Sequence, residues 1–396
     1  MGPCERIGHT GEGSGQDLKV AHQASAAGEP PAGASACRDE GARGTKKEGH
    51  ASFAGKRVHK KTRQVLTMKE KDRDLPKVRS LLAPGPARVL CGSGSSPEYE
   101  SFLSRFCNAH REKGNREHFG DVGMAEIKSL VGNIRERAGR VESHAARTLA
   151  NELELVMIVA RSEEHRRMFE ECGGIYAASA AMHTYASFSD IQVNGCKALI
   201  NMGKGGAAKE QIGRSGALEV IVNAMQEHFE CDQVQEKGTW ALGVLVATCP
   251  ENKVLVGEAG GVDSICEAMR MYSGNGQMQQ TCLWALGSLA ANYPDNAARM
   301  GKKGGLVLIV NAMKNFAESA SMQEMGCWAM ANIAAGNLRC SEYLVKKEGP
   351  QCVIQAMKTF PKSTSLQYVG LVALCHFGSD AALEKLMTLP SFALFQ

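Results

Sequence analysis

The sequence lacks the short patterns that mark most enzymes and metal sites. None of its 14 cysteines falls in a C-x-x-C pair, and no G-x-x-x-x-G-K-[ST], H-E-x-x-H or G-x-S-x-G motif is present. Those spacings hold zinc, nucleotide phosphates or a nucleophilic serine in place. The sequence therefore predicts no catalytic residues, no metal site and no cofactor.

Long apolar runs are missing as well. A helix that spans a bilayer needs roughly 20 consecutive apolar residues, no such run occurs, and the mean hydropathy is −0.23. The first residues also lack the charged start and apolar stretch of a secretory signal. We therefore expect no membrane insertion. The unpaired cysteines favour a reducing compartment, which predicts a cytoplasmic protein, with the nucleus as an alternative.

A surplus of one charge is confined to the start of the chain. Residues 1–80 hold 16 of the 46 Lys and Arg but only 10 of the 42 Asp and Glu, so the remainder is almost neutral. This balance does not favour nucleic acid as a partner. Residues 1–95 are rich in Gly, Ser and Lys and poor in large apolar side chains, which predicts a disordered basic tail. Its densest run, 56–63, is a solvated charge run, a nuclear-import signal or a self-inhibitory segment.

Internal repetition dominates the rest of the chain. A pair of small residues, usually Gly-Gly, leads to Ala-Met five times, and the five methionines recur every 43 or 44 residues: Met182, Met225, Met269, Met313 and Met357. A glutamine keeps the same step: Gln192, Gln235, Gln279, Gln323 and Gln367. A period of this length is the size of a three-helix repeat unit.

The segment that begins with each glutamine predicts a helix with one apolar face. An alanine recurs six residues after the glutamine in every repeat: Ala198, Ala241, Ala285, Ala329 and Ala373. Apolar rows on either side of it follow helical spacing. A single repeat cannot bury such a face, so the units must stack on one another.

Two local signals predict where helices begin and end. The paired glycines predict left-handed turns that end a helix. Three of the glutamines follow Ser189, Asp232 and Thr364 by three residues, which is the spacing of a capping box. This spacing predicts that the glutamines satisfy free N–H groups at helix starts.

These repeats resemble the armadillo-repeat family, of the β-catenin and importin-α type. The Gly-Gly and Ala-Met segments carry the resemblance together with strings such as Trp240-Ala241-Leu242, Trp284-Ala285-Leu286 and Trp328-Ala329-Met330-Ala331-Asn332. The resemblance covers residues 173–378. It implies an all-α fold, an armadillo-type right-handed superhelical solenoid of about six three-helix repeats. It also implies a non-catalytic protein-interaction scaffold whose concave groove, lined by the third helices, receives an extended or disordered peptide.

The predicted organisation follows from these features. We expect a disordered tail (1–95), a leading helix with a linker (96–119), a degenerate first repeat (120–172), the armadillo repeats (173–215, 216–259, 260–303, 304–348 and a cap at 349–389) and a C-terminal tail (390–396).

The groove predicted by the resemblance is lined by rows that lie off the apolar face. The residue before each alanine gives Lys197, Trp240, Trp284 and Trp328, so all three tryptophans of the chain share one row. The row four residues later contains Asn201, Ser288, Asn332 and His376, and the row four residues earlier contains Glu236 and Glu324. We predict that these ten residues bind the partner.

Each residue type in these rows suggests a different contact. Rigid aromatic side chains are frequent binding hot spots, and an indole beside a glutamate suits a Lys or Arg side chain. The resemblance implies that the asparagines hold the backbone of the ligand. The alternative is that the tryptophans only fill space between repeats.

Two further functions remain open: an importin-α-like nuclear-import adaptor, and an armadillo fragment of a larger signalling protein. Only Trp328 and Asn332 keep the W-x-x-x-N pattern of importin-α-like grooves, because Val244 and Ser288 interrupt it elsewhere. We expect a protein partner, no small-molecule substrate and a monomer.

Overall fold

The computed structural model describes residues 122–140 and 145–378. These residues form seventeen α-helices and include no strand, so the predicted all-α fold is confirmed. The predictions for residues 1–95, 96–119 and 390–396 lie outside the described residues.

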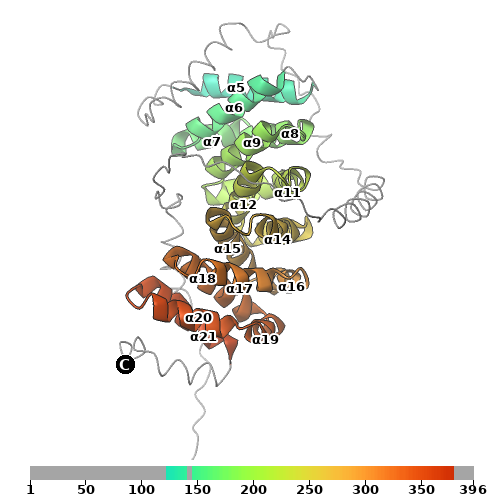
Figure 1. Cartoon of the computed structure of the whole chain (residues 1–396). Coiled ribbons are helices and arrows are strands. Elements are labelled where there is room, and N and C mark those ends of the chain that lie inside the picture. The colour runs from blue at the N-terminus through green and yellow to red at the C-terminus, as the bar shows by residue number, and fades with distance from the viewer. Residues whose placement is uncertain (1–121, 141–144, 379–396) are drawn as a thin grey trace, which may run out of the picture. The chain divides into compact units, whose positions relative to one another are not determined.

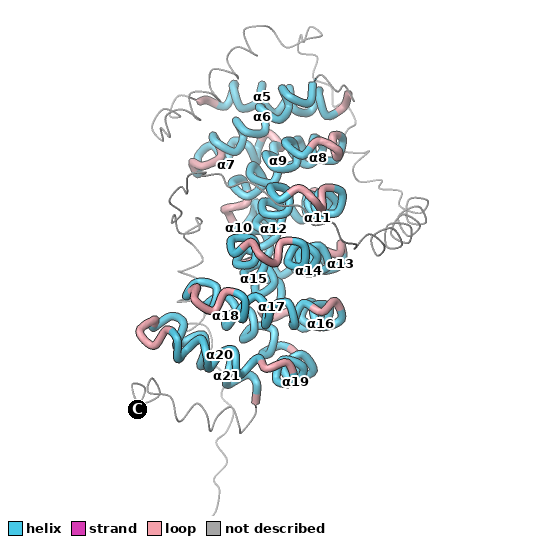
Figure 2. The backbone as a smooth tube through the Cα atoms, viewed as in Figure 1, coloured by secondary structure: helices cyan, strands magenta, loops and turns pink. Residues whose placement is uncertain are grey.

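The helices fall into three sets that alternate along the chain (Figures 1 and 2). The first helices are α7 (Glu163–Glu171), α10 (Gly206–Arg214), α13 (Pro250–Glu258), α16 (Pro294–Lys302) and α19 (Leu338–Lys346). The second helices are α5 (Met124–Ala138), α8 (Gly174–Thr184), α11 (Ala217–Glu227), α14 (Gly261–Met271), α17 (Gly305–Asn315) and α20 (Gly349–Thr359). The third helices are α6 (Ala145–Val159), α9 (Ser189–Met202), α12 (Asp232–Val246), α15 (Gly276–Ala290), α18 (Ala320–Gly336) and α21 (Thr364–Phe377).

Helices of one set pack against the next member of the same set. The third helices contact one another in chain order from α6 to α21, as do the second helices from α5 to α20. Neighbouring third helices share far more contacts than neighbouring second helices do. The array is therefore a solenoid in which the third helices form the most closely packed layer.

Left-handed turns separate the first helix from the second, as the glycine pairs predict. Gly173, Gly216, Gly260 and Gly304 have φ between 72° and 88°, a conformation that only glycine adopts without strain. The last repeat differs, because Glu348 takes this position with φ 66° and Gly349 begins α20.

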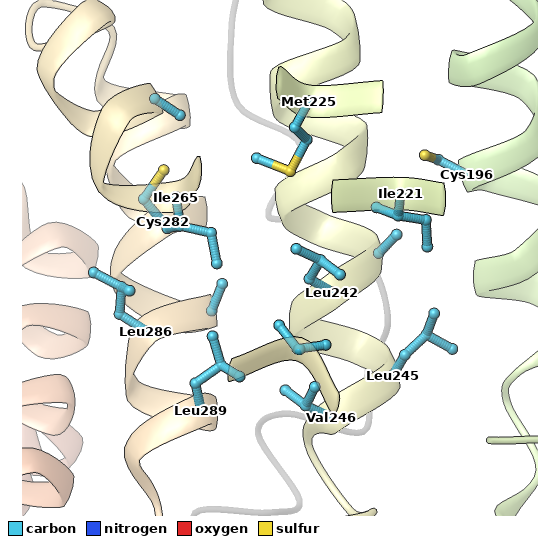
Figure 3. Close-up of a cluster of buried hydrophobic side chains, with 14 of the residues drawn as sticks. Cys196, Ile221, Met225, Leu242, Leu245, Val246, Ile265, Cys282, Leu286 and Leu289 are labelled. Carbon is cyan, nitrogen blue, oxygen red and sulfur yellow. The ribbon is translucent and has the colours of Figure 1, made fainter. Parts of the chain in front are cut away.

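One continuous core runs through all the described repeats. In Figure 3, Ile221 and Met225 of α11, Leu242 of α12, Ile265 of α14 and Leu286 of α15 meet across the boundary between repeats. The invariant alanines are all fully buried at 0% exposure. A larger side chain there would overpack the core, because protein interiors are close-packed.

The glycines three residues before these alanines accommodate methionine side chains. A Cβ at Gly195 would lie 2.4 Å from Cγ of Met182, and one at Gly326 would lie 2.4 Å from Cγ of Met313. The recurring Met and the recurring Gly are thus two halves of one contact, between the second and third helices of the same repeat.

The predicted role of the glutamines is wrong. Each one donates from Nε2 to two carbonyls at the end of the second helix; for Gln279 these are Met269 O at 2.8 Å and Tyr272 O at 3.0 Å. The other four make the same pair of bonds. A helix end leaves carbonyls without partners, and the buried glutamines satisfy them there.

The capping residues of the third helices lie one position earlier than the spacing suggested. The side chains of Asn275, Ser319 and Ser363 accept a hydrogen bond from the backbone N–H three residues on. The residues at the N-caps of α9 and α12 are Phe188 and Cys231, which make no such bond. Ser189, Asp232 and Thr364 are already the first residues of their helices.

The first helices reach the ends of the following third helices. Lys209 Nζ donates to Thr248 Oγ1 at 2.8 Å just beyond α12, and Lys253 Nζ donates to Ala291 O at 2.6 Å just beyond α15. Burial lowers the pKa of both lysines from 10.5. A cation at the C-terminal end of a helix also interacts favourably with the helix dipole.

Candidate functional site: the tryptophan face

We use the name tryptophan face for the surface of the third helices formed by the row Lys197, Trp240, Trp284, Trp328 and Val372 and by the rows four residues earlier and later. All five residues of the central row are half-buried. The rings of Trp240 and Trp284 lie against each other, with centroids 4.6 Å apart and planes inclined at 31°. An aromatic strip therefore runs from α12 to α15.

Two of the indoles pack on glycines of the preceding third helix. A Cβ at Gly243 would lie 2.2 Å from Cζ3 of Trp284, and a Cβ at Gly287 would lie 2.4 Å from Cζ3 of Trp328. We call Gly243 and Gly287 the glycine sockets. Each socket brings an indole onto the neighbouring helix, so these rings join successive repeats and still keep an exposed part.

The tryptophans thus combine both roles that the sequence left open. They fill space between repeats, and they also present a partly exposed aromatic surface. The glycine sockets were not predicted from the sequence. Their signal was a glycine two residues after the alanine in the repeat that precedes Trp284 and in the one that precedes Trp328.

The asparagines predicted to hold a ligand are engaged within the array. Asn201 Nδ2 donates to Met157 O at 2.7 Å, and Asn332 Nδ2 donates to Gly287 O at 3.4 Å. Both bonds run from one third helix to the preceding one, so these amides hold neighbouring repeats together. The prediction for Ser288 is wrong, because its side chain is only 4% exposed and cannot line an open surface.

The two carboxylates predicted to hold Lys or Arg side chains also have partners. Glu236 Oε1 lies 2.6 Å from Lys237 Nζ, and Glu324 Oε2 accepts a hydrogen bond of 2.8 Å from Ser365 Oγ in the next repeat. Gln280, in the same row, accepts from Ser321 Oγ at 3.3 Å. The row thus forms hydrogen bonds between α15 and α18 and between α18 and α21.

Lys197 occupies the tryptophan row on α9 and lies in a cluster of charges. Its pKa is lowered from 10.5 by burial and by the positive charge of Lys237, while Glu154 and Glu236 oppose the shift. The ammonium therefore interacts with groups of both signs. His376, at the other end of the face, is exposed, and its carbonyl accepts a hydrogen bond of 3.0 Å from Ser341 Oγ.

Two hollows on the described surface lie elsewhere. One of about 510 Å³ lies between α5 and α7 and is lined by Met124, Glu163, Glu164, Arg167, Met168 and Glu171. The other, of about 200 Å³, is formed by the loops that follow α12 and α15. No lining residue of either belongs to the tryptophan face.

The described part of the chain shows neither a cluster of metal-binding side chains nor a helix suited to a membrane. Among residues 122–140 and 145–378, no three His, Cys, Asp or Glu side chains are close enough to hold a metal ion. No described helix has both the length and the apolar character needed to cross a bilayer. What the tryptophan face offers is a contact surface of aromatic and amide groups.

Comparison with known proteins agrees with this architecture. Residues 213–389 match the family model described as the LRRK2 ARM repeat. A designed armadillo repeat protein is 16% identical with a TM-score of 0.55, and another, in complex with the peptide (KR)4, is 17% identical with a TM-score of 0.53. Each of these matches covers 64% of this chain and 100% of the designed chain.

An engineered protein is also similar, at 20% identity and a TM-score of 0.55, over 64% of this chain and 96% of its own. At such identities the likeness concerns the fold alone. No curated protein matches the chain in sequence.

Stacked three-helix units joined by left-handed turns define an α-solenoid of the armadillo type. The described repeats therefore have an armadillo-repeat fold, and residues 213–389 are similar in sequence to the armadillo-repeat family.

Proposed function

We propose that the protein is a non-catalytic interaction scaffold that binds an extended or disordered protein segment along its tryptophan face. The observation that carries the proposal is the row of three half-buried tryptophans on consecutive third helices, two of them stacked at 4.6 Å. Rigid aromatic side chains that are already positioned lose little conformational freedom when a partner binds.

The position of this row within the array supports the same proposal. It lies on the layer of helices that pack most closely, and stacked repeats of this kind offer an extended surface to a partner. One of the structurally similar designed proteins is in complex with a peptide. A cytoplasmic or nuclear location and a monomeric state stay predictions.

The importin-α-like alternative has weaker support. Such a groove relies on paired tryptophans and asparagines, and only Trp328 and Asn332 keep that pair. The amide of Asn332 already donates to Gly287 O. We therefore favour the general scaffold over the import adaptor.

Proximity labelling with the full chain and two variants tests the proposal. Trp284→Ala removes the central indole of the face. Tyr343→Ala removes an aromatic side chain of similar size that is 38% exposed on α19, outside the face. Partners that disappear with Trp284→Ala and persist with Tyr343→Ala support the proposal, provided that circular dichroism shows both variants folded. An identical set of partners for both variants contradicts it.

A further inference from the structure

The charges at the N-terminal part of the tryptophan face cancel one another. Glu236 pairs with Lys237 at 2.6 Å, and both side chains are about one third exposed, at 35% and 32%. Lys197 interacts with the carboxylates of Glu154 and Glu236 and with the ammonium of Lys237. Lys197 and Glu236 of the face, with Lys237 and Glu154 beside them, thus form a group of four charges whose formal sum is zero.

The remainder of the face carries almost no charge. Helix α15 contains no Asp, Glu, Lys or Arg over its fifteen residues. Helix α18 contributes Glu324 alone, whose carboxylate accepts a hydrogen bond from Ser365. Helix α21 contributes no acidic or basic residue besides His376. A strong electrostatic field for steering a charged ligand is absent from these three helices.

The central row of this part of the face is apolar. Trp284, Trp328 and Val372 are half-buried in its central row, and Tyr368 of α21 is 42% exposed four residues before Val372. Leu371 on the same helix is also half-buried. Aromatic and aliphatic surface favours burial against apolar side chains, because such burial removes both surfaces from water.

We infer that the tryptophan face selects an extended protein segment of near-zero net charge that is anchored by aliphatic or aromatic side chains. This inference rests on the proposed function and names the chemistry of its partner. A Lys- or Arg-rich segment would compete with Lys237 for Glu236 and would approach Lys197, so its charges would gain little net attraction. The expectation that the glutamates hold Lys or Arg side chains is thereby replaced.

Selection from a display library of random peptides of about 12 residues, carried out with the full chain, tests the inference directly. We expect enriched peptides with aliphatic or aromatic anchors and no excess of either charge, and we expect their binding to be lost in Trp284→Ala. Their affinity should also change little with ionic strength, because exposed charges contribute little to it.

Two other outcomes of the selection overturn the inference in different ways. Enriched peptides rich in Lys and Arg that depend on Trp284 would contradict the neutral partner and leave the scaffold proposal intact. Enriched peptides that bind Trp284→Ala and the unmodified chain equally, or no enrichment at all, would contradict the scaffold proposal and the inference together.

A charge variant provides a second test with the peptide (KR)4 as the probe. Lys237→Gln removes the partner of Glu236 and one neighbouring positive charge, so the affinity for (KR)4 should rise about fivefold from a weak starting value. Lys358→Gln is the matched control, because it removes an exposed lysine of α20 outside the face. Tight, salt-sensitive binding of (KR)4 to the unmodified chain, unchanged by Lys237→Gln, would overturn the inference.

Discussion

Each third helix has an inward face, which is buried in the core, and an outward face, which is the tryptophan face. These two faces differ in how much their residues change from repeat to repeat. On the inward face the same alanine recurs five times at 0% exposure, and the same glutamine recurs with the same two carbonyl partners. On the outward face one row changes from Lys197 through three tryptophans to Val372. The inward face meets an identical packing requirement in each unit. The outward face meets no identical requirement in each unit, so under the proposed function we expect its composition to determine which partner binds.

The largest predicted effect concerns four buried thiols, three on the inward face of the third helices and Cys266 on the second helix α14. Burial raises the pKa of Cys196 and Cys266 from 9.0 to about 12, and it also raises the pKa of Cys282 and Cys327. In the unfolded chain these thiols ionise near pH 9, so the unfolded state alone gains from losing the protons. The contribution of each thiol to the free energy of unfolding is therefore complete below about pH 9. As the pH rises from about 9 toward about 12, this contribution should be lost at about 1.4 kcal/mol per pH unit for each thiol.

Urea denaturation at a series of alkaline pH values measures this loss. Lys197, Lys209 and Lys253 act in the opposite direction, because burial lowers their pKa from 10.5, but the four thiols outnumber them. Cys327→Ala should make the decline less steep, whereas Cys375→Ala, which removes an exposed thiol of the outward side, should not. A stability that stays constant from about pH 9 to about pH 11 would contradict the predicted burial.

The next largest effect is expected for the glutamine row. Gln279→Ala leaves Met269 O and Tyr272 O without their buried donor, which should cost about 2–4 kcal/mol of unfolding free energy. Gln277→Ala on the same helix removes an exposed side chain and should change stability by less than about 0.5 kcal/mol. Equal denaturation midpoints for the two variants would rule out the proposed role of the row.

The glycine sockets join the tryptophan face to the packing between repeats. A double-mutant cycle of Gly287 and Trp328 measures how much this contact contributes to stability. Gly287→Ala places a Cβ against the indole of Trp328 and should cost about 1–3 kcal/mol. In a Trp328→Ala background the same substitution should cost much less, because the ring is gone and the remaining close contact is with Cα of Ala329 at 3.2 Å. Additive losses in the double variant would show that the glycine matters for another reason.

The smallest change in stability is expected on the outward face itself. Trp284→Ala should cost about 1–2 kcal/mol, because the ring is half-buried, which is less than the roughly 3–5 kcal/mol lost when a core aromatic is removed. It should nevertheless weaken partner binding by about 1–3 kcal/mol. Calorimetry and a titration with an identified partner measure the two quantities. A larger loss of stability than of binding would make the row a purely structural element.

The repeat period and the apolar rows were sufficient to predict the fold. Regular spacing of Ala and Met fixes which face of each helix is buried, and the structure buries Ala285 and Met269 as expected. The spacing did not predict the direction of side-chain hydrogen bonds. Glutamine carries both donors and an acceptor, so Gln279 fits a helix start or a helix end equally well until the geometry is known.

The site was harder to predict because its contacts cross between repeats. The sequence identified the row of Trp240, Trp284 and Trp328, but the bonds that engage Glu324 and Asn332 join residues 41 and 45 positions apart. Such pairings depend on the rotation between neighbouring units, which composition and helical period do not specify.

The glycine sockets restrict the order in which these repeats can be joined. The repeat that contains Trp284 carries its own socket in Gly287. After a tandem duplication of residues 260–303, the indole of the second copy would lie on the Gly287 of the first copy without a clash. The repeat that contains Trp328 carries Ala331 at the corresponding position, and a tryptophan repeat grafted after it would meet a methyl group. A ring that packs as Trp284 and Trp328 do therefore requires a glycine at this position of the preceding repeat. Trp240 follows Ile200 and has no such socket, so its repeat can succeed a unit that the other two cannot.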